Sequence, residues 1–145
     1  MGGRTLAEGR RLSDDGRMIA EQTTMLYYAD LAAARAFYGE LLGLEVHFED
    51  TWVSLYRTTP TSALGVVGEH ASAFHRPQAT SAVMVSLVVS CVEPWFERLR
   101  GGGAKILRAP YDHASVPIRA LLVEDPGGYA LEFFAWRARG EARAP

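Results

Sequence analysis

The side chain with the clearest chemical potential in this sequence is the carboxylate of Glu132. Its sequence neighbours are leucine and phenylalanine, so we expect the carboxylate to be partly shielded from water. A shielded carboxylate can serve as a general base or as a hydrogen-bond acceptor for a ligand. It can equally serve a structural role, as an ion pair with Arg119 or Arg57. The sequence leaves both interpretations open.

Histidine and cysteine, the other common metal ligands and proton carriers, are scattered along the chain. Each of the four histidines falls in a predicted hairpin, linker or loop: His47, His70, His75 and His113. Cys91 is the only cysteine, which excludes an intramolecular disulfide and a cysteine-rich zinc site. These side chains therefore predict no metal centre.

The composition is that of one globular domain without an extreme charge. The chain has 145 residues, 48% of them hydrophobic and 22% charged, with a formal net charge of −2, which is ordinary for a folded protein. Lysine and arginine form no basic stripe of the kind that a phosphate backbone requires, so nucleic acid is not expected as a partner. The longest apolar runs, such as residues 120–123, are too short to span a bilayer. Because the N-terminus has no signal-peptide pattern, we expect a cytoplasmic protein and no membrane partner.

The first half of the chain predicts a strand, a helix and three further strands. Residues 23–28 are β-prone. Asp30 is suited to cap the following helix, whose apolar residues recur at i, i+3, i+4 and i+7, and Gly43 is suited to end it. Three predicted strands follow, separated by turn-forming residues, at 45–49, 52–57 and 63–67.

The second half repeats this order. A strand at 83–89 precedes a second amphipathic helix that begins near Val92 and ends at a run of three glycines, and the last strands fall near 104–107, 118–123 and 129–135. Leu26 corresponds to Leu87 and Thr23 to Met84, each pair 61 positions apart. A repeat of this kind predicts two tandem βαβββ units.

We therefore predict an α+β fold made of two similar units. The predicted divisions are an N-terminal tail (1–20), the first unit (21–67), a linker (68–81), the second unit (82–136) and a C-terminal tail (137–145). The two tails are polar and lack a sustained periodicity, so we expect them to be flexible.

Three phrases of the sequence resemble the vicinal oxygen chelate superfamily, which includes glyoxalases, bleomycin-resistance proteins and extradiol dioxygenases. They are the first-helix residues Asp30-Leu31, Ala36-Phe37-Tyr38 and Leu41-Leu42-Gly43-Leu44, the second-helix run Trp95-Phe96-Glu97-Arg98-Leu99, and the closing hairpin Asp125-Pro126-Gly127-Gly128-Tyr129 with Leu131-Glu132-Phe133. They occur in order over residues 22–136. The resemblance implies that each unit curls a mixed sheet into an open half-barrel. It also implies that two half-barrels pair around a cleft, within one chain or across a dimer.

Metal-dependent members of that superfamily place one ligand on the first strand and one on the last strand of each unit. The resemblance matches these four positions to Thr23, Gly65, Met84 and Glu132. Only Glu132 carries a usual ligand for a hard divalent ion. We therefore expect no metal cofactor, and the metal-dependent chemistry of the superfamily is not implied for this chain.

Strand alternation predicts which residues line the cleft, because successive side chains of a strand point to opposite faces. The predicted lining is mostly aromatic and apolar with a few polar groups, as in a pocket for a planar or hydrophobic small molecule. It comprises Thr23, Met25, Tyr27, Trp52, Ser54, Tyr56, Met84, Ser86, Arg119, Glu132 and Phe134, with Val88 and Ala130 beside them. The alternative is that the same aromatic side chains fill a closed cleft.

Two classes of function follow from this lining. The first is a binding protein for a small aromatic or hydrophobic molecule, similar to the drug-sequestering members of the superfamily. The second is a lyase, isomerase or dioxygenase, either metal-free with Glu132 as base or metal-dependent through an unrecognised site. A structural or regulatory dimer with a filled cleft is a third possibility. We also expect a homodimer, because open sheet edges and an apolar cleft favour a partner.

Overall fold

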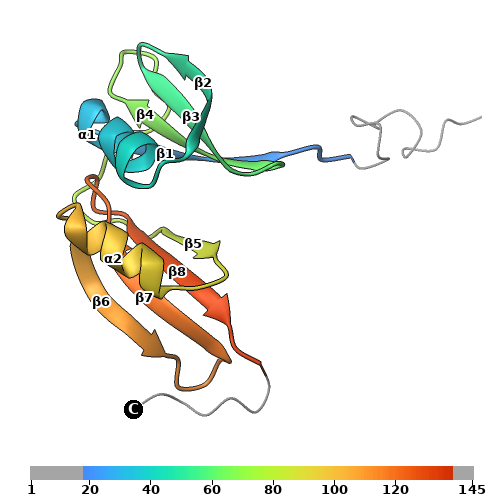
Figure 1. Ribbon diagram of the computed structural model, residues 1–145. Coiled ribbons are helices and arrows are strands. Elements are labelled where there is room, and N and C mark those ends of the chain that lie inside the picture. The colour runs from blue at the N-terminus through green and yellow to red at the C-terminus, as the bar shows by residue number, and fades with distance from the viewer. Residues whose placement is uncertain (1–17, 139–145) are drawn as a thin grey trace, which may run out of the picture.

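The computed structural model describes residues 18–138 as two four-stranded sheets, each with a helical segment on one face (Figure 1). The predicted tails, residues 1–20 and 137–145, lie outside the described residues apart from 18–20 and 137–138. Among the helices of residues 18–138, none has the length and apolar character needed to cross a membrane.

The first unit has its elements in the predicted order. They are β1 (Gln22–Tyr28), α1 (Leu31–Arg35), the π-helical turn η1 (Ala36–Leu41), β2 (Glu45–Asp50), β3 (Val53–Thr59) and β4 (Ser62–Gly68). The strand order is β1-β4-β3-β2, in which β1 and β4 are parallel and the other neighbours antiparallel. The Asp30 side chain caps α1 by accepting a hydrogen bond from the Ala33 backbone N at 3.0 Å. Gly43 ends the helical segment with a φ of 69°, a left-handed conformation that glycine adopts without strain.

The helical segment of the first unit widens where it meets the core. The Leu42 backbone N donates to the Phe37 carbonyl at 2.9 Å, a step of five residues. This wider turn lets Phe37, Tyr38 and Leu42 lie on one side of the helix, and all three are buried.

The second unit repeats the topology of the first. Its elements are β5 (Met84–Val88), α2 (Glu93–Gly101), β6 (Lys105–Asp112), β7 (Ile118–Glu124) and β8 (Ala130–Trp136). The strand order is β5-β8-β7-β6, in which β5 and β8 are parallel. Pro94 lies in the first turn of α2, where a helix needs no N–H donor. The predicted α+β class, with two tandem βαβββ units and open sheets, is confirmed.

Strand β6 is longer than the sequence pattern predicts. The predicted strand covered residues 104–107, whereas β6 continues to Asp112. Pro110 is tolerated because β6 is an edge strand. The register also shifts on either side of Arg108. Each shift is a bulge that interrupts the alternation on which the prediction depended.

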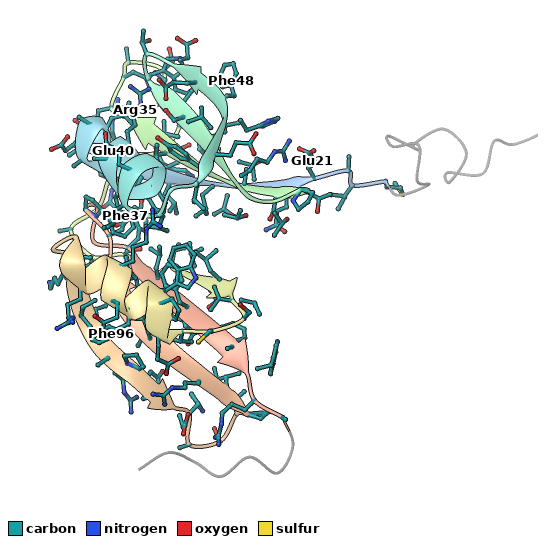
Figure 2. All side chains as sticks on the ribbon, viewed as in Figure 1. Glu21, Arg35, Phe37, Glu40, Phe48 and Phe96 are labelled. Carbon is teal, nitrogen blue, oxygen red and sulfur yellow. The ribbon has the colours of Figure 1, made fainter. Side chains whose placement is uncertain are left out.

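One continuous core joins the helix-covered faces of the two sheets. Buried side chains of both units, such as Val66 and Phe133, belong to the same hydrophobic cluster. Phe37 lies at the junction between the units (Figure 2). A pocket of about 380 Å³ opens between the same two faces, and its walls include Leu64 of the first unit and Leu87 of the second. Because the helix-covered faces meet inside the chain, the opposite faces of the two sheets are turned outward.

A buried polar cluster also joins the units. The hydroxyl groups of Tyr28 and Tyr38 in the first unit both donate to Asp125 Oδ2 in the second, Tyr38 at 2.7 Å. Asp125 Oδ1 accepts hydrogen bonds from the backbone N of Gly127 and of Tyr129, each at 2.9 Å. Burial raises the pKa of both tyrosines well above the usual range, and the nearby Asp125 adds to the effect. The cluster therefore fixes one unit against the other through hydrogen bonds shielded from water.

Candidate functional site

The face of each sheet opposite its helix, here called the cavity face, is the candidate site. Residues paired across neighbouring strands share a face, so the register defines its members. On the first unit the register gives three rows: Thr23, Ala63 and Arg57; Met25, Gly65, Leu55 and Phe48; and Tyr27, Val67 and Val53. On the second unit the rows are Met84, Ala130 and Glu124; Ser86, Glu132, Leu122 and Arg108; and Val88, Phe134, Ala120 and Tyr111.

The middle row of the first unit is apolar and closely packed. Met25 lies across Gly65, where an added Cβ would come within 2.4 Å of the Met25 Sδ and 2.9 Å of Leu55 Cδ2. Glycine at position 65 therefore leaves the space that the thioether fills. Met25 remains partly exposed, so this packed row forms part of the molecular surface.

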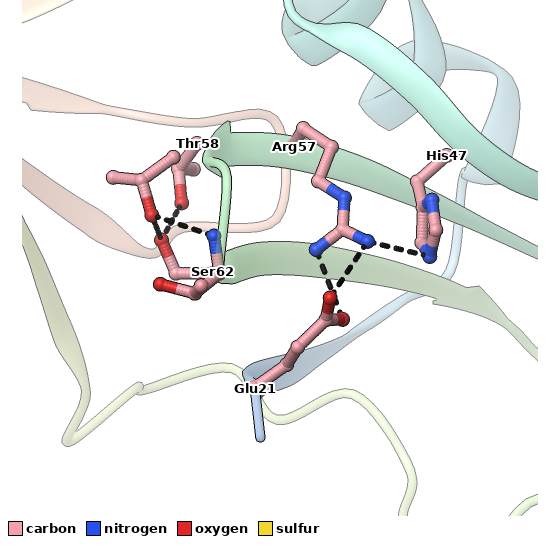
Figure 3. Close-up of polar contacts among 7 residues, drawn as sticks. Glu21, His47, Arg57, Thr58 and Ser62 are labelled. Atoms are coloured by element: carbon pink, nitrogen blue, oxygen red, sulfur yellow. Dashed lines mark hydrogen bonds and ion pairs between the residues drawn. The ribbon is translucent and has the colours of Figure 1, made fainter. Parts of the chain in front are cut away.

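The charged groups on the first cavity face gather at one end, around Arg57 (Figure 3). Arg57 Nη1 donates to Glu21 Oε2 at 3.0 Å, and Nη2 donates to Glu21 Oε1 at 3.2 Å. Nη2 also donates to His47 Nε2 at 2.9 Å. The hydrogen bonds from Arg57 lower the pKa of Glu21 below its usual value. These hydrogen bonds from Arg57 therefore link the start of β1 to β3.

Two histidines of the linker between β4 and β5 pack on aromatic side chains of the first unit. The ring of His70 lies 4.6 Å from the ring of Trp52, and that of His75 lies 5.3 Å from Tyr27. Phe74 packs edge-on against His75 at 4.6 Å. The linker therefore borders the cavity face at its Tyr27 end.

The middle row of the second unit is polar where that of the first is apolar. Ser86 Oγ donates to Glu132 Oε1 at 2.9 Å. At the other end of the row, the guanidinium carbon of Arg108 lies 3.5 Å from the centroid of the Tyr111 ring. Leu122 separates the two polar groups.

The structure brings most of the predicted lining residues together on these two faces. Thr23, Met25 and Tyr27 share the cavity face of the first unit. Met84, Ser86, Val88, Ala130, Glu132 and Phe134 share that of the second.

The predicted cavity positions of Ser54 and Tyr56 are wrong. Both side chains lie on the helix side of β3, where they are 0% and 2% exposed. Val53 and Leu55, which alternate with them along the strand, occupy the cavity face instead. Burial accordingly raises the pKa of the Tyr56 hydroxyl.

A hydrogen-bond network explains how a serine can be buried at position 54. Its hydroxyl accepts a hydrogen bond from Arg35 Nε at 2.8 Å and donates one to Glu49 Oε2 at 2.9 Å, so the buried hydroxyl group is paired. Trp52, the third residue predicted from the same run, lies in the turn before β3 and packs against His70.

Arg119 lies on the helix side of β7, so its predicted position in the cleft is also wrong. It donates to Glu93 at the start of α2 and to Asp112 Oδ1 at 3.2 Å. The hydrogen bond between Arg119 and Glu93 raises the pKa of the arginine and lowers that of the carboxyl group. Glu132 pairs with neither Arg119 nor Arg57, the two structural partners predicted for it.

Arg108 and Tyr111 reach the cavity face although the predicted strand ends before them. Arg108 is opposite Leu122 and Tyr111 is opposite Ala120 because two bulges shift the register of β6. The sequence carries no signal for these bulges, so alternation alone could not have assigned either residue.

The sequence from residue 22 to residue 133 matches the family model described as the Glyoxalase/Bleomycin resistance protein/Dioxygenase superfamily. The match includes both βαβββ units. The chain belongs to this superfamily. The resemblance seen in the sequence is thereby confirmed. No curated protein matches the chain.

Solved structures of the superfamily share this fold at low sequence identity. A glyoxalase/bleomycin resistance protein/dioxygenase from Nocardioides is 22% identical, with a TM-score of 0.67 over 85% of this chain and 87% of its own. A lactoylglutathione lyase from Agrobacterium tumefaciens is 19% identical, with a TM-score of 0.64 over 84% of this chain and 97% of its own. A fosfomycin resistance protein from Listeria monocytogenes is 13% identical, with a TM-score of 0.63 over 79% of this chain and 90% of its own. These likenesses concern the fold.

Of the residues that the resemblance matches to the superfamily's metal ligands, only Glu132 offers a group that a hard divalent ion prefers, a carboxylate. Thr23 offers a hydroxyl and Met84 a thioether. The position of Gly65 is covered by Met25. Within residues 18–138 no group of three or more histidine, cysteine, aspartate or glutamate side chains lies close enough to hold a metal.

Proposed function

We propose that this superfamily member binds a small aromatic or hydrophobic molecule against the cavity faces of its sheets. The observation that supports the proposal is the apolar surface exposed there. Met25, Met84 and Val88 are 39%, 53% and 59% exposed, and Phe48 is 50% exposed. Apolar side chains grouped on one face of a sheet are typical of a surface that another molecule covers.

We further propose that the binding cleft forms across a homodimer. The cavity faces of one chain are turned outward, so they cannot enclose a molecule between them. The sheets also end in the edge strands β1 and β5, and open edges of this kind favour association with a second copy. A ligand would then contact the first unit of one copy and the second unit of the other.

Binding of a neutral planar probe tests the ligand class. We expect 2-naphthol, titrated by calorimetry, to bind the wild-type protein. Met84→Glu is expected to weaken binding about tenfold or more, because the carboxylate must be desolvated against an apolar ligand. Val116→Glu is the matched control, because Val116 is an exposed apolar residue in the loop between β6 and β7. Equal losses in both variants, or no binding by the wild type, would contradict the proposal.

Complementation between two variants tests the dimeric cleft. Met25→Glu damages the first unit and Met84→Glu the second. In a cleft shared between copies, a mixed dimer has one doubly damaged site and one intact site. Random association of equal amounts of the two variants makes about half of the dimers mixed, so probe binding should return at about a quarter of the wild-type stoichiometry. A cleft within one chain predicts no recovery. Light scattering on the wild-type protein should give the mass of a dimer.

We also propose that the ligand binds without a metal ion. The donor set at Thr23, Gly65, Met84 and Glu132 supports this. Elemental analysis of protein purified without a chelator is expected to find no divalent ion in stoichiometric amount. One ion per chain, lost together with probe binding on dialysis against a chelator, would contradict the proposal.

The hydrogen bond from Ser86 to Glu132 supports an alternative, a metal-free lyase or isomerase. In that case Glu132 acts as the general base and Ser86 orients its carboxylate toward the bound molecule. Glu132→Gln would then abolish turnover and leave ligand affinity nearly unchanged. If the protein only binds its ligand, neither the wild type nor the Glu132→Gln variant converts any candidate substrate.

We place the protein in the cytoplasm. Cys91 is exposed and forms no disulfide, and a free surface thiol of this kind persists most readily in a reducing compartment. Fractionation of cells that produce the protein is expected to recover it with the cytoplasmic markers.

A further inference from the structure

Arg108 differs from the other arginines that the structure describes. Each of the others donates to, or pairs with, a carboxylate, a hydroxyl or a backbone carbonyl: Arg35, Arg57, Arg76, Arg98, Arg100, Arg119 and Arg137. The Arg108 side chain has no hydrogen bond or ion pair with any residue in the described range, and it is exposed. Its five N–H donors are therefore available to a molecule on the cavity face.

Tyr111 holds the Arg108 side chain on that face. The guanidinium carbon lies directly over the ring, 3.5 Å from its centroid, in a cation–π contact. The register places Arg108 opposite Leu122, in the same row as Glu132. Among residues 18–138 the guanidinium thus has no acceptor. Tyr111 holds it in position on the face that the proposed function assigns to the ligand.

We propose that Arg108, supported by Tyr111, binds a carboxylate of the ligand, which makes the ligand an aromatic carboxylic acid. The inference rests on the proposed function, because it requires a ligand on this face. The planar guanidinium matches a carboxylate with two parallel hydrogen bonds. Stacking on Tyr111 restricts the arginine before the ligand arrives, which reduces the entropy lost on binding.

The other residues of this row, Leu122 and Glu132, indicate the chemistry of the rest of the ligand. Leu122 lies between Arg108 and Glu132, which are two strand spacings apart, or about 10 Å. At that separation, salt largely screens the repulsion between Glu132 and the ligand carboxylate. A bicyclic aromatic body fits over Leu122, with its far edge toward the Glu132 carboxylate. A hydroxyl or amine at that edge can donate to Glu132.

A matched pair of probes separates the charge from the ring system. We expect calorimetry to show that 2-naphthoate binds the wild-type protein about tenfold more tightly than 2-naphthamide, the ratio that one charge-assisted contact provides. Arg108→Gln should remove this preference by lowering the affinity for naphthoate far more than that for the amide. Tyr111→Phe should keep the preference because it keeps the ring, whereas Tyr111→Leu should reduce it severalfold.

Arg100→Gln is the control for loss of a positive charge. Arg100 also lies over a ring, at 5.7 Å from that of Phe96, but both residues belong to α2 rather than to the cavity face. Figure 2 shows Phe96 on that helix. Its removal should leave the preference for naphthoate intact. Equal binding of both probes to the wild type, or a preference that survives Arg108→Gln, overturns the carboxylate site and leaves the hydrophobic pocket standing. Absence of binding by either probe overturns the proposed function and this inference with it.

Discussion

The two units are copies of one fold, yet they differ along the same row of their cavity faces. Where the first unit has Met25 beside Gly65, the second has Ser86 beside Glu132 in the equivalent register. The rows end differently as well, in an exposed phenylalanine on the first unit and in Arg108 on the second. In both units a leucine, Leu55 or Leu122, lies in the middle of the row.

This difference shows how one backbone can provide two kinds of surface. With no side chain at position 65, the Met25 thioether lies over the strand and covers the row with apolar atoms. With a carboxylate at position 132, the neighbouring strand supplies Ser86 as a hydrogen-bond donor. In the dimer that we propose, one surface packs against the ligand and the other orients it. The predictions that follow test this division between the units.

The largest effect is expected where the units are joined. Asp125→Ala leaves the buried hydroxyls of Tyr28 and Tyr38 without their acceptor. We expect the free energy of unfolding, measured by urea denaturation, to fall by about 3–5 kcal/mol. The control is Asp30→Ala, which removes an exposed helix cap and should cost about 1 kcal/mol. Similar losses in the two variants would show that the cluster does not join the units.

Alkaline pH should weaken the same junction. The pKa of Tyr28 and of Tyr38 is raised in the folded state, so above about pH 10 the unfolded chain loses these protons while the folded chain keeps them. Stability is therefore fully present below that pH and falls as the pH rises. Between pH 10 and 11 two such groups lower the free energy of unfolding by about 2–3 kcal/mol.

Single tyrosine variants check the source of that pH dependence. Tyr38→Phe should reduce the slope of unfolding free energy against pH by about one proton's worth, or 1.4 kcal/mol per pH unit. Phe37→Leu changes a side chain of the same core cluster but removes no hydroxyl group, so it should leave the slope unchanged. An equal change in both variants would assign the slope to altered core packing rather than to the buried hydroxyl group.

The sequence predicts the fold of both units and, on the second unit, the cavity-face residues of β5 and β8. In β5 and β8, large apolar residues such as Phe133 alternate with Ser86 and Glu132, so the two faces can be told apart. In β3 the cavity face carries the apolar residues Val53 and Leu55, whereas the buried helix side carries Ser54 and Tyr56. A hydrophobic pattern therefore assigns Ser54 and Leu55 to the wrong faces.

For the other misplaced or missed residues, the sequence contained a signal of the correct position in some cases and none in others. Arg119 alternates in phase with Leu121 and Val123, which are buried, so its helix-side position could have been inferred. The position of Arg108 could not, because it depends on two bulges around it. The junction at Asp125 was equally hidden, since a turn aspartate that accepts hydrogen bonds from distant tyrosines looks like an ordinary turn residue.

The helix-covered sides of the units also differ in how deeply their equivalent residues are buried, and Leu26 and Leu87 allow this difference to be tested. Leu26 is 2% exposed, whereas Leu87 borders the pocket between the units and is only partly buried. Leu26→Ala is expected to lower the free energy of unfolding by about 3 kcal/mol and Leu87→Ala by roughly half of that. Equal losses of stability in the two variants would contradict this difference between the two sides.

The smallest effect on stability is expected from copying the second unit's pair into the first. The double variant Met25→Ser, Gly65→Glu gives β1 and β4 the residues that β5 and β8 carry at the equivalent positions. Removing Met25 clears most of the space that a side chain at 65 requires, and Leu55 needs to shift only slightly. Because the new carboxylate lies at a surface beside a serine donor, we expect the free energy of unfolding to fall by less than about 1–2 kcal/mol.

Ligand binding should respond far more strongly to this double variant than folding does. A cleft with polar rows on both sides has lost its apolar wall, so 2-naphthol should bind about tenfold more weakly, in line with the apolar area removed. The single variant Met25→Leu, which keeps the row apolar, should bind the probe as the wild type does. If the double variant retained full affinity, the first unit would not supply the packing surface, and the difference between the two rows would have no part in recognition.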